Sequence, residues 1–389
     1  MSNILLIGNG FDLAHKLPTK YTDFLNFMQL IKYIQPQIDT HNISLNEINC
    51  YNLDPRIISL IKQKLLSSER TPINDELIEY SINNIWLDYF VQCDMHGLEN
   101  WIDFESEISN VIQSLDKDLG EKNVYSSIEQ LSTPFLSTFI LSNATNTSYT
   151  YKQLIDTLLN DLNKLIRCFE IYLADYIDNI QCINPLPLIS SLNIDCILSF
   201  NYTQTYLKLY SKNPTFYYIH GRADTNNSLE TNNMVLGIDE YLKNDEKKTK
   251  IEFIEFKKFY QRILKQTGSD FVELIDNIRA NRINYDFDAD PIEYEDFIYT
   301  STSKSDILYT LYIFGHSLDK TDSDILHAII CNPNVCTVIF YKDLDQKRKQ
   351  IANLVNVLGP DELINKTGGL YKRITFVDQN NYSPSIISQ

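Results

Sequence analysis

The sequence lacks the features that mark membrane, secreted and zinc-binding proteins. Its 389 residues include seven cysteines at irregular spacing and no C-x-x-C pair, so neither a zinc module nor a redox dithiol is indicated. No apolar run approaches the ~20 residues that a membrane span requires. The start, MSNILLIGNG, has no basic stretch and no small-residue cleavage site. We therefore expect a cytoplasmic protein with no zinc and no membrane partner, whose cysteines mostly pack as small side chains.

Positive charge is scarce as well. Lys and Arg number 34 against 51 Asp and Glu, which gives a formal net charge of −17. This balance argues against nucleic acid or an anionic membrane as a partner, although a local basic patch could still bind either. With 43% hydrophobic residues, the chain is long and apolar enough to bury a core.

Glycine is used sparingly, and its positions are informative. Of the 11 glycines, five follow short apolar runs, namely Gly8, Gly10, Gly221, Gly237 and Gly315. A residue without Cβ at the end of a strand lets the backbone turn sharply or approach a ligand. A tight turn explains each one alone. Five together indicate the rim of a parallel sheet, where open α/β folds bind ligands.

Apolar and amphipathic segments alternate along the chain. Short apolar runs predict strands at 3–7, 194–199, 215–219, 234–238, 308–314, 336–341 and 373–377. They predict an α/β fold in which residues 1–34 and 186–389 form a Rossmann-like parallel sheet flanked by helices. A large helical insertion at 35–185 would cover the cleft at the sheet rim. A smaller insertion would occupy 241–300, with the Lys-rich face around 243–265 in solvent.

The first polar motif, Gly8-Asn9-Gly10-Phe11-Asp12, directly follows a predicted strand. Two glycines at this spacing let backbone amides face a phosphate at a helix N-terminus. A dinucleotide fingerprint would place a third glycine where Leu13 stands, so a plain strand–turn–helix is the alternative. Asp12 fits either a helix cap or an acceptor for a ribose hydroxyl.

Two further strand ends carry groups suited to chemistry. Asn201, in SFNYT, has one acceptor and two donors, so it can orient a polar ligand or a water. The alternative is a turn residue that bonds local backbone. His220 stands beside Gly221 at the end of another strand, and an imidazole that titrates near ~6.5 suits acid–base work. A purely structural histidine is the alternative there.

A third polar turn is Phe314-Gly315-His316-Ser317-Leu318-Asp319. His316 and Asp319 could be site residues. However, Thr321 and Asp324 have the spacing of a capping box that opens a helix over 322–330. Capping and turn chemistry therefore account for much of this stretch.

Glu105 lies on the apolar side of a helix predicted over 101–115, together with Trp101. A carboxylate on an apolar stripe is costly unless it is paired. Either an Arg or backbone amides hold Glu105, or it projects into the pocket. Asp103 falls on the opposite side, and Asn100 is expected to cap this helix.

In this order, the motifs resemble the bacteriophage abortive-infection AbiH family. The similar landmarks are GNGFDLAHKLPTKYTDFL at 8–25, NWIDFE at 100–105, SFNYTQT at 199–205, IHG at 219–221, VLGID at 235–239 and IFGHSLDKTD at 313–322. The resemblance implies an antiphage defence protein that responds to a phage trigger, which the sequence does not identify. Such a protein must be restrained in uninfected cells, and activation on assembly into a homo-oligomer is one way to achieve this.

That family in turn resembles, at a distance, the sirtuin-type NAD-binding superfamily. The resemblance rests on the Gly-rich turn followed by Leu17-Pro18, on Asn201, on His220-Gly221, on Gly237 and on the Gly315-x-Ser317-Leu318 turn. It implies a sirtuin-like fold that takes NAD or a related nucleotide as substrate or ligand. Two departures matter. Thr203 stands where sirtuins carry an acid, and the four-cysteine zinc module is missing, so we reject protein deacetylation.

The sirtuin-like resemblance implies cleavage of NAD to nicotinamide and ADP-ribose through an oxocarbenium-like state. Asn201 would hold a water or the ribose, and His220 would act as the base. The turn at 8–12 would hold the diphosphate, and 315–317 the adenosine side. The cofactor-binding positions implied are Gly8, Asn9, Gly10, Asp12, Thr203, Gly221, Gly315, His316, Ser317 and Asp319, with Glu105 as a further pocket residue.

Two alternatives belong to other classes. A nucleotide-binding sensor would bind NAD without hydrolysing it; Thr203 favours this reading, whereas the pairing of Asn201 with His220 favours hydrolysis. A nuclease could use Asp12, Asp319 or Glu105 with Mg²⁺. The net charge of −17 argues against a nuclease, and no paired-carboxylate motif stands out.

Overall fold

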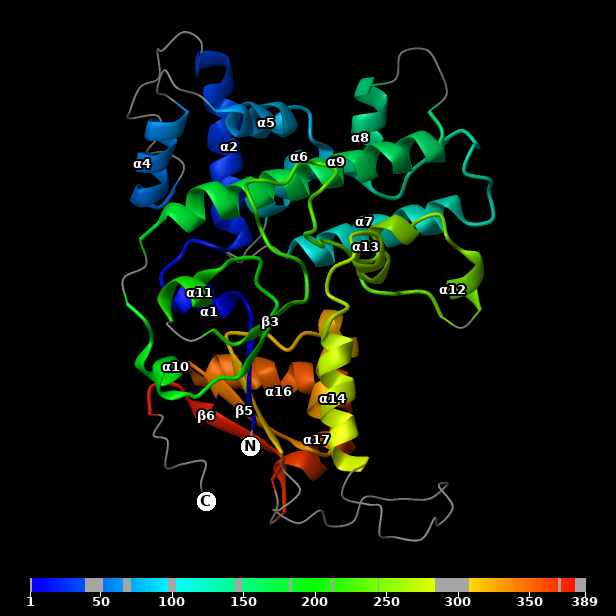
Figure 1. The fold of residues 1–389 in the computed structure, drawn as a ribbon. Coiled ribbons are helices and arrows are strands. Elements are labelled where there is room, and N and C mark those ends of the chain that lie inside the picture. The colour runs from blue at the N-terminus through cyan, green and yellow to red at the C-terminus, as the bar shows by residue number, and fades with distance from the viewer. Residues whose placement is uncertain are drawn as a thin grey trace. The chain divides into compact units, whose positions relative to one another are not determined.

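The chain forms two compact units, each assembled from separate segments (Figure 1). The sheet unit comprises Met1–Leu17, Cys182–His220 and Gly268–Gln389, and the helical unit comprises Pro18–Gln181 and Gly221–Thr267. The computed structural model describes residues 2–38, 52–65, 71–96, 103–143, 149–181, 184–210, 213–243, 245–283, 308–369 and 372–381. Within these ranges, no helix has the length and apolar character needed to cross a membrane.

The sheet unit is built on a six-stranded parallel sheet in the order β3-β2-β1-β4-β5-β6. Its strands are β1 (Ser2–Ile7), β2 (Cys196–Ser199), β3 (Thr215–Tyr218), β4 (Tyr309–Phe314), β5 (Val335–Tyr341) and β6 (Ile374–Asp378). Ile7, at the end of β1, lies opposite Ser199 on β2 and Phe314 on β4. The predicted α/β architecture with a parallel sheet is confirmed, and the carboxyl ends of all six strands lie along one edge.

Helices cover both faces of this sheet, which is why its central strands are continuously apolar. The alternation of side chains sends Ile4 and Leu6 into one core and Leu5 and Ile7 into the other. The first core includes residues of α14 (Phe271–Ile283), α15 (Ser323–Ile330), α16 (Leu344–Leu358) and α17 (Pro360–Thr367). The second core includes residues of α1 (Asn9–Ala14), α10 (Pro187–Ser191) and α11 (Thr205–Leu209).

The helical unit packs around a cluster of aromatic rings. Phe104 stacks between Tyr21 and Phe90, with a centroid distance of 4.2 Å to each. The elements of this unit are α2 (Tyr21–Ile38), α4 (Pro55–Lys64), α5 (Pro72–Ser81), α6 (Ile85–His96), α7 (Phe104–Leu119), α8 (Pro134–Asn143), α9 (Tyr151–Ile171), the π-helix η2 (Tyr172–Tyr176), the 3-10 helices η3 (Ile177–Asn179) and η4 (Ile254–Phe256), α12 (Glu246–Thr249) and α13 (Lys258–Leu264).

The strand predicted at 234–238 is wrong. This apolar stretch is buried in the helical unit and forms only an isolated bridge between Ile238 and Lys257. Gln261 Oε1 accepts from Leu236 N at 3.1 Å, whereas Ile238 N donates to Phe256 O and Ile238 O accepts from Lys258 N. Gly237 therefore does not end a strand of the sheet. A buried apolar run resembles a strand in sequence whether or not it joins a sheet.

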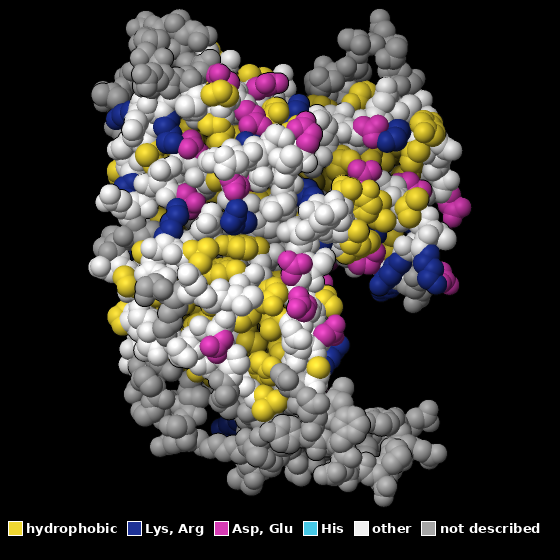
Figure 2. Space-filling view, viewed as in Figure 1, with side chains coloured by type: hydrophobic (Ala, Val, Ile, Leu, Met, Phe, Trp, Pro, Cys, Tyr) yellow, Lys and Arg dark blue, Asp and Glu magenta, His cyan; other side chains and the backbone are white. Residues whose placement is uncertain are grey.

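The Lys-rich stretch around 243–265 is only partly in solvent. Lys257 and Lys258 are both 2% exposed, because Glu240 and Glu105 bind their ammonium groups at 2.9 and 2.7 Å. Buried lysines require such partners, and sequence periodicity does not reveal a partner that is distant in the chain. On the face drawn in Figure 2, Lys and Arg side chains lie among acidic and apolar ones.

The predicted caps of two helices are also wrong. Asp103, rather than Asn100, caps α7, since its carboxylate accepts from Glu105 N at 3.1 Å; Asn100 and Trp101 lie outside the described residues. Asp319 caps the 3-10 helix η6 (Lys320–Asp322) by accepting from Thr321 N. Because this short helix intervenes, the capping box expected from Thr321 and Asp324 does not open α15.

Candidate functional site

The ends of β1 and β4 make an unusually close approach. Gly8 N donates to Phe314 O at 3.3 Å, and Gly10 N donates to Gly315 O at 2.8 Å. A Cβ on Gly10 would lie 2.7 Å from Gly315 Cα, and one on Gly8 would lie 2.8 Å from His316 Cα. Glycine is therefore required for the two turns to touch. The N–H groups of Gly8 and Gly10 are used within the protein, although the sequence suggested that they face a phosphate.

Asn201 joins a third strand end to the same place. Its Nδ2 donates to Gly8 O at 3.0 Å, and Ser199 Oγ donates to Asn201 O at 3.0 Å. Asn201 is buried, so these bonds fix the orientation of its side chain. The ends of β1, β2 and β4 are thus linked through one amide and two glycine turns.

Asp12 and Thr203 form a second link between the turns after β1 and β2. Thr203 Oγ1 donates to Asp12 Oδ2 at 2.7 Å, and Thr205 Oγ1 donates to Thr203 Oγ1 at 3.2 Å. Both Asp12 and Thr203 are buried. A carboxylate therefore lies in direct contact with the Thr203 hydroxyl.

His220 and His316 meet at a shared carboxylate. His220 Nε2 lies 3.1 Å from Asp322 Oδ1, and His316 Nε2 lies 3.5 Å from Asp322 Oδ2. The Phe200 ring contacts both imidazoles edge-on, with centroid distances of 5.4 and 4.4 Å. All of these side chains are buried.

The turn after β4 is held from its far side by α16. Gln350 Nε2 donates to His316 O at 3.3 Å, and Asn353 Nδ2 donates to Ser317 O at 2.9 Å. Leu318 N donates to His316 Nδ1 at 2.9 Å. Backbone and side-chain bonds thus fix both the position and the ring orientation of His316.

The sheet unit brings together most of the residues singled out from the sequence. The bonds above link Gly8 to Asn201 and Gly10 to Gly315, and His316 packs closely against Gly8. Asn9 begins α1 between the two glycines. Asp319 lies in the connection between β4 and α15, and its carboxylate caps η6.

Gly221 and Glu105 belong to the helical unit. Gly221 has a φ of +83°, and a Cβ there would lie 2.2 Å from Asn233 O. Glu105 binds Lys258 Nζ at 2.7 Å, so its carboxylate is satisfied by a lysine rather than by the Arg or backbone amides expected. Its role as a pocket residue stays a prediction.

Asp322 and His15 are two buried residues of the sheet unit whose contacts the sequence does not predict. The sequence pattern indicates only a helix start at Asp322, which follows His316 by six residues. No sequence pattern assigns a role to His15. Its Nε2 lies 2.9 Å from Tyr210 Oη, and burial lowers the pKa of this imidazole. An acid shortly after a strand-end histidine was the available signal for Asp322.

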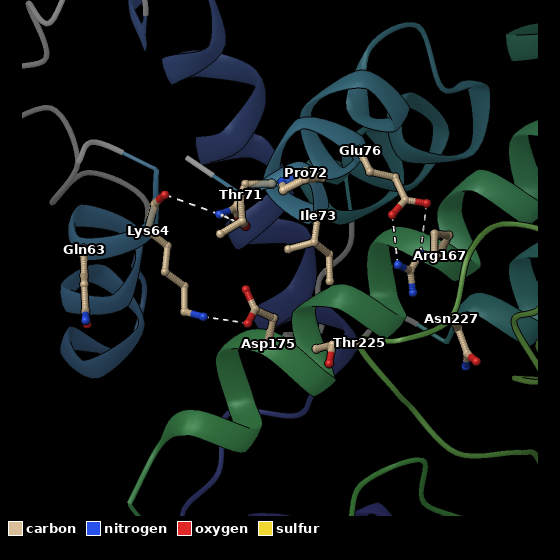
Figure 3. A pocket seen from close by; sticks show the side chains of 11 residues that line it. Gln63, Lys64, Thr71, Pro72, Ile73, Glu76, Arg167, Asp175, Thr225 and Asn227 are labelled. Atoms are coloured by element: carbon tan, nitrogen blue, oxygen red, sulfur yellow. Dashed lines mark hydrogen bonds and ion pairs between the residues drawn. The ribbon is translucent and has the colours of Figure 1, made fainter. Parts of the chain in front are cut away.

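The helical unit has a pocket of about 840 Å³ that is lined by polar, charged and apolar side chains. Figure 3 shows Lys64 paired with Asp175 at 2.6 Å and Arg167 paired with Glu76 at 2.9 Å in its wall. None of the site residues predicted from the sequence lines this pocket. Within the described residues, no group of three or more His, Cys, Asp or Glu side chains could hold a metal ion.

Comparison with known proteins gives the identity of the family. No curated protein matches the chain. The model of the family described as bacteriophage abortive infection AbiH matches residues 4–341, a range that contains β2 to β5 and all of β1 except its first two residues. The chain therefore belongs to the bacteriophage abortive infection AbiH family.

Proposed function

We propose that this AbiH protein defends cells against phage by cleaving NAD in its sheet unit. Membership of the family implies a role in abortive infection. The observation that carries the enzymatic proposal is the meeting of Asn201, His220 and His316 with two glycine turns at the carboxyl ends of parallel strands. That combination offers amide, imidazole and carboxylate groups where open α/β sheets bind ligands.

The strand order supports a nucleotide as the ligand. The order β3-β2-β1-β4-β5-β6 is that of doubly wound dinucleotide-binding sheets, whose ligands bind where the order reverses. Here the reversal falls between β1 and β4. Gly10 and Gly315 follow these two strands, and their close approach would shape the floor of a nucleotide site. In this proposal they contribute shape rather than amide donors.

The chemistry assigned to the site is hydrolysis of the nicotinamide–ribose bond. The C1′–N bond breaks, and its electron pair goes to the nicotinamide nitrogen, which loses its positive charge. A water oxygen forms the new bond to C1′ through an oxocarbenium-like state. Asn201 orients this water or the ribose, and His220 accepts the proton that the water loses.

The direct test is to incubate the purified protein with NAD and measure nicotinamide and ADP-ribose by chromatography. His220→Gln is expected to lower the rate by ~10²–10⁴, the usual contribution of a positioned base. His327→Gln is the matched control, since His327 is exposed on α15 and has no assigned role. Release of nicotinamide at the wild-type rate by His220→Gln would remove the catalytic assignment.

A second candidate is a sensor that binds NAD without cleaving it. The observation that favours it is Thr203, whose hydroxyl is already bonded to Asp12 at the position where the resemblance calls for an acid. Calorimetry with NAD separates the two functions. Binding without any release of nicotinamide supports the sensor, and binding with turnover supports the hydrolase.

A further inference from the structure

We propose that Asp322 is a positioning residue of this site, which fixes the orientation and tautomer of His220 and anchors His316 beside it. The catalytic meaning of this inference rests on the proposed NAD cleavage, whereas the tautomer rests on geometry alone. Asp322 would not touch the substrate. It would act only through the imidazole that does.

The carboxylate of Asp322 is directed at the two histidines rather than at its own helix. Asp322 occupies the cap position of α15, yet its side chain makes no capping hydrogen bond. Its two oxygens instead face His220 Nε2 at 3.1 Å and His316 Nε2 at 3.5 Å. The side chains of Asp322, His220 and His316 are only 11%, 6% and 4% exposed.

The hydrogen bonds determine where each imidazole carries its proton. His316 Nδ1 accepts from Leu318 N, so the proton of the neutral ring is on Nε2, facing Asp322. An ionised carboxylate only accepts, so the nitrogen of His220 that faces Asp322 must also be protonated. The ring nitrogen opposite a hydrogen-bonded N–H is the one left to accept a proton. For His220 that atom is Nδ1.

This arrangement suits a base in the proposed reaction. When His220 Nδ1 takes a proton from water, the ring becomes an imidazolium beside the Asp322 carboxylate. A nearby opposite charge favours the charged form. The Phe200 ring, packed edge-on against both imidazoles, restricts their rotation. Asp322 therefore both holds His220 in place and stabilises its protonated state.

The backbone is strained next to the cluster of Asp322, His220 and His316. Leu318 has a φ of +61°, a left-handed conformation that is strained for a residue with a side chain. Its N–H is the donor to His316 Nδ1, and the turn it makes leads the chain on to Asp322. Strain of this kind persists where surrounding contacts require it, which is expected if the His316–Asp322 geometry is needed.

The tautomer is tested first, on the wild-type protein with ¹⁵N-labelled histidine. His220→Gln identifies the His220 signals among those of the six histidines. We expect the neutral ring to carry its proton on Nε2, and we expect its pKa to fall by about one unit or more in Asp322→Asn, because the variant loses the adjacent negative charge. The titratable groups described around this ring are Asp322, Tyr202 and, through Asp322, His316. A neutral ring protonated on Nδ1 would overturn the inference.

Kinetics with NAD supply the second readout. Asp322→Asn is expected to lower kcat by ~10²-fold or more, with KM changed less than ~3-fold, since a group that acts through the base affects the chemical step rather than binding. Asp324→Asn, an exposed change of the same kind on α15, should leave kcat unchanged. If His220→Gln is inactive but Asp322→Asn turns over at the wild-type rate, the inference fails and the proposed function stands. If wild-type protein releases no nicotinamide, the proposed function fails, and the labelled histidine spectra still decide the role of Asp322.

Discussion

Thr203 donates a buried hydrogen bond to Asp12 across two separate strand ends, with 2.7 Å between Oγ1 and Oδ2. The two residues are 191 positions apart in the chain. The bond links the turn after β2 to α1, the helix after β1. It places the carboxylate of Asp12 against the side chain of Thr203.

We predict that Thr203→Val destabilises the sheet unit by about 1–3 kcal/mol, because the valine leaves the buried Asp12 oxygen without this donor. Urea denaturation measures the change in the free energy of unfolding. Thr215→Val, an exposed threonine on β3, is the control and should change it by no more than about 0.5 kcal/mol. Equal effects of the two variants would mean that the Thr203–Asp12 bond contributes nothing to stability.

The sheet was largely predictable from the sequence because a parallel sheet leaves a simple signal. NILLI, DCILS and LYTLYIF are short apolar runs with no polar alternation, as expected of strands covered on both faces. The same signal wrongly predicts a strand at 234–238, where an equally apolar run is buried without joining the sheet. A short buried segment looks alike in sequence whether another strand or the side chain of Gln261 satisfies its backbone.

Gly315 gives a second prediction. Its φ is +69°, and a Cβ there would lie 2.3 Å from Phe11 N and 2.4 Å from Gly10 C. Gly315→Ala therefore adds a backbone collision to the strain of the left-handed conformation, and we expect it to destabilise the protein by more than the ~1–3 kcal/mol of strain alone.

Gly359→Ala separates the two contributions. Gly359 has a φ of +82°, but a Cβ there meets nothing within 4 Å, so only the strain applies. Thermal melting of both variants measures the difference. If Gly315→Ala melts no lower than Gly359→Ala, the close approach of the β1 and β4 turns is not required.

A third prediction concerns the helical unit. Glu170 is fully buried, and it accepts from Arg167 Nη1 at 2.7 Å, from Asn227 Nδ2 at 2.5 Å and from Asn232 Nδ2. Glu170→Gln leaves the buried Arg167 with one carboxylate fewer. Removing one partner of a buried ion pair costs about 3–5 kcal/mol, and we expect a loss of that order in urea denaturation.

The control for Glu170 is Glu79→Gln, an exposed glutamate on α5. It should change the free energy of unfolding by no more than about 0.5 kcal/mol. A loss below about 1 kcal/mol in Glu170→Gln would mean that Glu76, which also binds Arg167, is a sufficient partner for the guanidinium.

The candidate site was predictable in its members but not in its contacts. Gly8, Gly10, Asn201, His220 and Gly315 stand out because each follows a strand. What they do there depends on partners far away in the chain. No sequence pattern indicates that Gly10 N donates to Gly315 O, or that Lys258 binds Glu105. Asp322 was hidden for another reason, because acids near a helix start are usually caps.

Lys265 gives a prediction on pH. Desolvation by burial lowers the pKa of its ammonium group to about 8, while the charge of Glu170 acts in the opposite direction. An unfolded lysine titrates near ~10.4. Between pH ~8 and ~10.4 the unfolded chain therefore binds a proton that the folded chain has released, so stability from this residue rises with pH across that window.

The measurement compares wild type with Lys265→Met by urea denaturation at several pH values from about 7 to 10. The stability of wild type relative to Lys265→Met should increase as the pH rises above about 8. Lys247→Met, at an exposed position on α12, should show no such trend. A difference between wild type and Lys265→Met that stays constant with pH would contradict the lowered pKa.

The last prediction joins the site to phage defence. His220→Gln keeps an amide N–H that can donate to Asp322, so the cluster should stay folded while the base is lost. Asn201→Ala removes the donor to Gly8 O, which costs about 1–3 kcal/mol, and is the less conservative change. We expect both variants to be present in cells at wild-type levels but to lose protection, so that phage plates as efficiently as on cells without the protein.

His327→Gln should protect normally. Protection is measured as efficiency of plating, and cellular NAD is measured during infection. If His220→Gln melts like wild type and still protects, catalysis by His220 is not part of the defence, and a nucleotide-binding sensor accounts better for the buried, hydrogen-bonded site.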